Sequence, residues 1–68
     1  VQITVADQDV VGMSLRELRL PDDAIVLTIL RGDQWIMPHG YTTLRLHDEV
    51  TLVGKRESLA DLTRRFGY

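Results

Sequence analysis

The chain has 68 residues, a formal net charge of −2 and no cysteine. A chain of this length forms one domain and buries only about 60% of its unfolded surface, so small domains often need disulfides, a metal or a partner subunit. Disulfides and thiolate ligands are excluded, and His39 and His47 are too few for an ordinary zinc site. We therefore expect the domain to pair as a homodimer.

Charged residues are scattered evenly along the sequence. They form no basic stripe for a phosphate backbone, which argues against nucleic acid as a partner. No apolar run approaches the roughly 20 residues of a membrane span, and the N-terminus does not resemble a signal peptide. Because Val1 lies within an expected strand, we interpret residues 1–68 as a single domain excised from a longer protein.

The first third of the chain predicts a strand followed by a short helix. Apolar and polar residues alternate from Val1 to Val5, which indicates a strand with one buried face. Asp7 to Asp9 then predicts a polar turn. Ser14 and Glu17 have the spacing of a capping box, so a helix is expected to begin there and to end at Pro21.

The middle of the chain predicts a hairpin. Residues 24–30 are apolar on both alternating faces apart from Thr28, which favours a strand covered on one side by the domain's own helix and on the other by a second subunit. Turn residues 31–34 connect it to a strand at 35–37. Pro38-His39-Gly40 then forms a tight loop.

The last third predicts two further strands and a helix. Alternation predicts strands at 44–46 and 50–53, and Gly54 ends the second. A stripe at i, i+3 and i+7 predicts a helix over 57–66, with Gly67 as its cap. The stripe consists of Leu59, Leu62 and Phe66. The fold class is α+β, with a small, mostly antiparallel sheet of four to five strands, a short helix after the first strand and a C-terminal helix.

Several short motifs follow one another in a fixed order. They are VGMSLREL at 11–18, LP at 20–21, ILRGD at 29–33, PHGYTTL at 38–44, DEVTLVG at 48–54 and ESL at 57–59. Together they resemble the C-terminal domain of regulators of potassium conductance, the RCK-C or TrkA C-terminal domain, over nearly the whole chain. The family usually has Gly-Asp before the last strand, where this chain has His47-Asp48. Glycine adopts positive φ readily, and histidine does so at some cost.

This resemblance implies a regulatory α+β module at the cytoplasmic end of potassium-uptake subunits, cation/proton antiporters and other transporters. It implies twofold dimers and a membrane cation transporter as the attached or associated partner. Some members of the family bind cyclic di-AMP between two subunits, and others have no assigned ligand. Cyclic di-AMP or another small anionic molecule is therefore the expected ligand, with no further cofactor.

Five residues are candidates for ligand binding, each with a simpler alternative. Arg31 follows an apolar strand and can offer a bidentate fork to a phosphate or carboxylate, or it is an exposed strand-end arginine. Ile25 and Val26 can supply apolar surface for a base or a partner, although alternation directs at least one into the core. Pro38 and His39 lie in the loop after the hairpin, where a histidine can bind a ligand or be merely solvated.

Other chemistry finds little support in the sequence. His39 and His47 do not have the spacing of a compact metal site, and acidic pairs at 22–23 and 48–49 are typical of turns. Trp35 either stacks on a partner or fills the edge of the core. Without a nucleophile and base, the sequence predicts no enzyme. Ligand-sensing regulation is the leading hypothesis, and a purely structural dimerisation module is the alternative.

Overall fold

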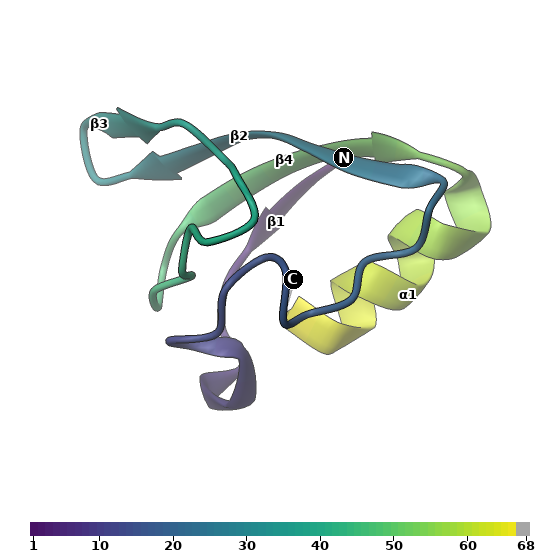
Figure 1. Cartoon of the computed structure of the whole chain (residues 1–68), viewed down its shortest axis with the longest axis horizontal. Helices are drawn as coiled ribbons and strands as arrows, with labels where there is room; N and C mark the ends of the chain where they lie inside the picture. Colours follow the sequence, from purple (N-terminus) through teal and green to yellow (C-terminus); the bar gives the residue numbers. More distant parts are fainter. Residues whose placement is uncertain (67–68) are drawn as a thin grey trace.

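The computed structural model describes residues 1–66, which form a four-stranded sheet with one α-helix. The strands lie in the order β1-β4-β2-β3, and every neighbouring pair is antiparallel. The elements are β1 (Gln2–Thr4), the 3₁₀ helix η1 (Gln8–Val10), β2 (Ala24–Arg31), β3 (Gln34–Ile36), β4 (Glu49–Gly54) and α1 (Arg56–Phe66). In Figure 1, α1 lies beside one face of the sheet and the β2–β3 hairpin extends away from it. The predicted α+β fold, hairpin and C-terminal helix are confirmed.

A bulge in β2 decides which of its apolar residues face solvent. Ile25 pairs with Val53 and Val26 with Leu52, but the register against β4 then shifts between Val26 and Thr28. Ile25 and Leu27 are 59% and 49% exposed, whereas Ile29 is fully buried. Strict alternation would place residues 25, 27 and 29 on one face, and the extra residue of a bulge breaks that alternation.

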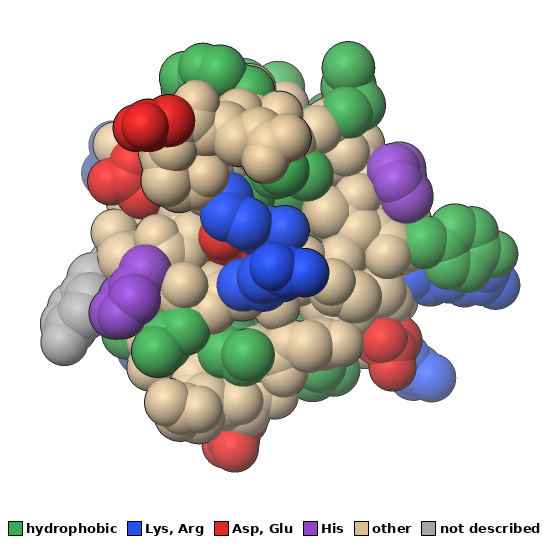
Figure 2. Space-filling view, turned by 90° about the vertical axis from the view of Figure 1, so that its left-hand side faces the viewer, with side chains coloured by type: hydrophobic (Ala, Val, Ile, Leu, Met, Phe, Trp, Pro, Cys, Tyr) green, Lys and Arg blue, Asp and Glu red, His purple; other side chains and the backbone are tan. Residues whose placement is uncertain are grey.

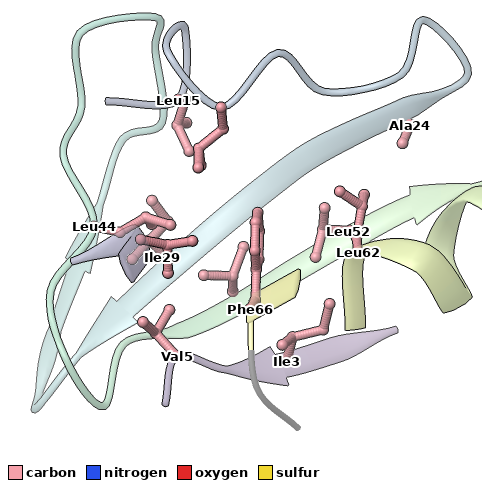
Figure 3. Packing of buried hydrophobic residues seen from close by; sticks show 12 residues of the cluster. Ile3, Val5, Leu15, Ala24, Ile29, Leu44, Leu52, Leu62 and Phe66 are labelled. Atoms are coloured by element: carbon pink, nitrogen blue, oxygen red, sulfur yellow. The ribbon is translucent and has the colours of Figure 1, made fainter. Parts of the chain in front are cut away.

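The core lies between the sheet and α1 and includes three leucines from the loops, Leu15, Leu18 and Leu44. Figure 3 shows Phe66 of α1 among side chains of the sheet and loops. Residues with no exposed surface are Ile3, Val5, Ile29, Leu44, Val50, Leu52, Leu62 and Phe66. Full burial of a large apolar side chain contributes about 1.5–3 kcal/mol. The expected stripe on the C-terminal helix is confirmed, with Leu62 and Phe66 buried and Leu59 packed partly against the core.

The expected helix at Ser14 is wrong, although its capping box is present. The Ser14 amide donates to Glu17 Oε1 at 3.0 Å, and the Glu17 amide donates to Ser14 Oγ at 3.2 Å. The chain makes only one turn because Arg19 has φ 52°, outside the right-handed helical region, and Pro21 follows. The helical element after β1 is instead η1, capped by Asp7, where a polar turn was expected.

Residues 44–46 do not form the expected strand. Leu44 is buried, but its backbone bonds to the segment before Ser14: its amide donates to Met13 O at 3.0 Å and its carbonyl accepts from the Gly12 amide at 2.8 Å. Leu46 is exposed. The proposed cap Gly67 lies outside the described residues. Within residues 1–66, the one α-helix is too short and too polar to cross a bilayer.

Candidate ligand-binding site

A pocket of about 430 Å³ opens beside the start of β2. Its walls are the turn after Ser14, the first residues of β2 and the loop after β3. It is lined by Leu15, Arg16, Leu20, Ala24, Ile25, Val26, Pro38, His39 and Gly40. Its volume lies within the range of sites for small molecules, and its lining is mostly apolar with few polar groups, as such sites usually are.

The structure brings four of the five predicted residues into this pocket. Ile25 and Val26 contribute from β2, and Pro38 and His39 from the opposite loop. Val26 also packs against the core while Ile25 is largely exposed, so only one of the pair is directed inward, as alternation predicted. Arg31 is the exception, because it lies at the far end of β2 and outside the pocket.

Backbone hydrogen bonds join two walls of the pocket. The Leu15 amide donates to Thr42 O at 2.9 Å, and the Arg16 amide donates to Gly40 O at 2.8 Å. A bridge between Ser14 and Thr43 continues this pairing. The loop that carries His39 is therefore held against the turn that carries Arg16, although the two are more than twenty residues apart in sequence.

Arg16 is the charged residue among those that line the pocket, and it was not predicted from the sequence. Its Nη1 donates to the Tyr41 hydroxyl at 2.9 Å, and its guanidinium carbon lies 5.7 Å from the centre of the Tyr41 ring. A guanidinium over a tyrosine face gains cation–π attraction and loses some of its freedom. No local pattern predicts this contact, because it depends on pairing with the loop around Gly40.

Arg31 forms the expected bidentate fork, but with a carboxylate of its own chain. Its Nε donates to Asp48 Oδ1 at 2.9 Å and its Nη2 to Asp48 Oδ2 at 2.8 Å. The same Nη2 donates to Thr43 O at 2.9 Å, and the Arg45 amide donates to Asp48 Oδ2 at 2.9 Å. Asp48 is 1% exposed, so the pair satisfies a buried charge. Contact of Arg31 with a ligand stays a prediction.

This pairing shifts the pKa of both side chains. Burial on its own raises the pKa of the Asp48 carboxyl, but the hydrogen bonds from Arg31 and Arg45 and the charges of both arginines outweigh it and hold the pKa below its usual value. The pKa of Arg31 is raised, mainly by its hydrogen bonds to Asp48. Figure 2 views the molecule from the left-hand side of Figure 1: basic side chains gather at the centre over a little visible acidic surface, with histidines on either side.

Three further features of the described residues bear on function. A second hollow of about 430 Å³ lies between α1 and the start of the chain, lined by Val1, Gly54, Arg56, Leu59, Ala60 and Thr63. Within residues 1–66, no three His, Asp or Glu side chains lie close enough together to hold a metal ion. Trp35, on β3, is 65% exposed and thus not part of the core edge.

Two of the relatives that the chain matches are named as cation-transport proteins. The chain is 39% identical over 61 residues to Trk system potassium uptake protein trkA homolog 1 of Methanosarcina mazei, covering 90% of this chain and 15% of that protein. It is 38% identical over 63 residues to the putative Na⁺/H⁺ antiporter YjbQ of Bacillus subtilis, covering 93% of this chain and 10% of that protein. The chain thus spans a small part of these relatives.

Solved structures of RCK domains have the same fold. An RCK domain described as being with cda superposes with a TM-score of 0.90 at 27% identity, covering 97% of this chain and 94% of that one. The RCK C domain of KtrA in complex with cyclic di-AMP gives a TM-score of 0.84 at 20% identity, covering 97% of this chain and 80% of that one. The TrkA-C domain model matches residues 1–67. The chain therefore belongs to the TrkA-C domain family, also called RCK-C, as the order of its motifs predicted.

Proposed function

We propose that this chain is a ligand-sensing and dimerising regulatory domain of a potassium or other cation transport protein. In this proposal it is one part of a longer protein, lies on the cytoplasmic side and carries out no reaction of its own. The potassium uptake proteins and the antiporter among its relatives support the transport role. The observation that carries the sensing role is the pocket between Arg16 and His39.

The pocket suits a small ligand that is flat and apolar in one part and anionic in another. Ile25, Val26 and Pro38 offer apolar surface for a base, and Arg16 offers a positive charge for a phosphate. Cyclic di-AMP has both parts, and it is the ligand named for the KtrA domain. Arg31 is six residues from Ile25, which is about 20 Å along a strand. Arg31 would therefore contact a ligand in this pocket only from a second copy of the chain.

The proposed homodimer would cover the apolar residues that β2, β3 and β4 leave in solvent. The largest of them are Ile25, Leu27, Trp35 and Val53. Exposed apolar groups in neighbouring strands are typical of a surface that meets a partner. Ile25 belongs to this surface and to the pocket, so a ligand that contacts Ile25 would change the free energy of pairing. A ligand can regulate the protein only if it binds two arrangements of the dimer with different affinities.

A thermal-shift titration with cyclic di-AMP tests the sensing role. A ligand present at 100 times its Kd stabilises a folded protein by about 2.7 kcal/mol, which is a clear shift in a domain of this size. Arg16→Ala should reduce that shift, and Arg64→Ala, on the exposed side of α1, should leave it unchanged. No shift in the unaltered domain would count against sensing.

A dimerisation module without a ligand is the second candidate. The exposed apolar residues favour it, because they form a surface that needs a partner whether or not the pocket is filled. This function predicts a stable dimer by sedimentation and no stabilisation by cyclic dinucleotides, mononucleotides or divalent cations. A monomer at high micromolar concentration would contradict both candidates.

A further inference from the structure

Thr42 is a buried polar residue at the base of the loop that carries His39. It is 7% exposed, and its hydroxyl accepts a hydrogen bond from the His39 amide at 3.1 Å while donating to Met37 O at 3.2 Å. Its own amide donates to His39 O at 3.0 Å. The hydroxyl thus acts as acceptor and donor at once, which valine cannot do and serine can.

The same loop fixes the ring of His39. The Tyr41 amide donates to His39 Nδ1 at 3.1 Å. A nitrogen that accepts a hydrogen bond carries no proton, so the neutral imidazole must hold its proton on Nε2. His39 lines the pocket, and in this tautomer its ring offers a hydrogen-bond donor. The ring of His47, by contrast, takes part in none of the side-chain hydrogen bonds found within residues 1–66.

We propose that Thr42 is a positioning residue of the pocket. Its hydroxyl closes the turn from Met37 to Thr42, and this turn places the Tyr41 amide on Nδ1, so that the neutral ring of His39 carries its proton on Nε2 and offers it as a donor. The pocket then selects a ligand with an acceptor oxygen near His39, such as a phosphate or carbonyl oxygen. The consequence for binding rests on the proposed function, whereas the tautomer of His39 can be measured without any ligand.

Long-range ¹H–¹⁵N correlation of the histidine rings, recorded at about pH 8, above the ordinary pKa of a histidine side chain, tests the tautomer directly. The unaltered domain should show His39 with its proton on Nε2 alone, and His47 as a mixture of tautomers. Thr42→Val should give His39 a mixed population, and Thr42→Ser should keep the single tautomer. If His39 has the same mixture as His47 in the unaltered domain, the proposal is overturned whatever the folding of the variants.

Calorimetric titration with cyclic di-AMP tests the consequence. Loss of a hydrogen bond worth about 1 kcal/mol predicts about fivefold weaker binding for Thr42→Val, and binding close to that of the unaltered domain for Thr42→Ser. Thr63→Val removes the hydroxyl that donates to Leu59 O in α1 and serves as the matched control, with unchanged binding. Equal affinities for Thr42→Val and the unaltered domain would overturn the positioning role. If the unaltered domain binds no cyclic di-AMP, the proposed function fails, and the ring correlations alone decide the role of Thr42.

Discussion

Arg31 and Asp48 join the end of β2 to the turn before β4 through two parallel hydrogen bonds of 2.9 and 2.8 Å. The same guanidinium holds the Thr43 carbonyl, so one side chain connects the hairpin with both ends of the 43–48 segment. Its place after an apolar strand made Arg31 a candidate ligand contact. In the folded chain it first satisfies a carboxylate that is 1% exposed.

Removing Arg31 should destabilise the domain, because it leaves the Asp48 charge buried without its partner. We expect Arg31→Met to lower the free energy of unfolding by about 2–3 kcal/mol, less than for a fully buried pair because the Arg31 side chain is 26% exposed. Urea unfolding measures the loss. Arg64→Met is the matched control: its ion pair with Asp61 is largely exposed and should contribute less than about 0.5 kcal/mol. Equal effects of the two substitutions would contradict this role.

The lowered pKa of Asp48 predicts that stability falls in acid. A carboxyl whose pKa is lower in the folded state contributes stability that is complete above its unfolded pKa of about 3.9 and is lost as the pH falls through its folded pKa. Unfolding free energies measured between about pH 5 and pH 2 should therefore decrease. Glu17, whose pKa is lowered by hydrogen bonds from Ser14, adds to the decrease.

Asp48→Asn separates the two contributions to this acid dependence. The variant keeps a similar shape and retains Glu17, so its stability at neutral pH should be lower and its decrease in acid shallower than in the unaltered domain. Parallel pH profiles for the two proteins would show that Asp48 is not the titrating group.

His47 occupies a backbone conformation that favours glycine, with φ 73°. A side chain in the left-handed region costs about 1–2 kcal/mol, partly offset on substitution by the greater freedom of glycine in the unfolded chain. His47→Gly should therefore stabilise the domain by about 0.5–1 kcal/mol and raise its Tm by a few degrees. His47→Ala keeps the strained backbone and should give no gain. A similar Tm for both variants would contradict the explanation.

The exposed surface of the sheet predicts a specific dependence of pairing on Leu27. This residue is half exposed in one chain, so Leu27→Asp should leave the fold intact but place a charge in the proposed interface. Sedimentation equilibrium should show a monomer for Leu27→Asp and a dimer for Leu46→Asp, a matched change in the loop before β4. A dimer in both variants would place the interface elsewhere.

Local patterns predicted much of the fold. The β2–β3 hairpin and α1 were found because their turn residues and the spacing of Leu62 and Phe66 are short-range signals. The predicted helix at Ser14 was wrong even though its capping box forms. The helix does not form because the backbone of Leu15 and Arg16 pairs instead with the loop at 40–42. Arg19 also has a positive φ, which a right-handed helix does not allow, so tertiary contacts override the local signal.

The pocket was predictable only in part. Ile25, Val26, Pro38 and His39 were candidates because of their places in an apolar strand and a tight loop, and two distant segments bring them together. Arg16 and Thr42 were not found, because their roles depend on hydrogen bonds to partners that the order of residues does not reveal. Arg31 had the right chemistry for a carboxylate, but the sequence could not show that the carboxylate is Asp48.

The most direct test of ligand sensing is a titration of the ¹⁵N-labelled domain with cyclic di-AMP, followed by amide chemical shifts. We expect saturable changes on the walls of the first pocket, at Leu15, Arg16, Ile25, Val26 and His39. Sensing at this pocket would be contradicted by changes confined to Arg56, Leu59 and Thr63 in the second hollow, or by a spectrum that stays unchanged up to millimolar ligand.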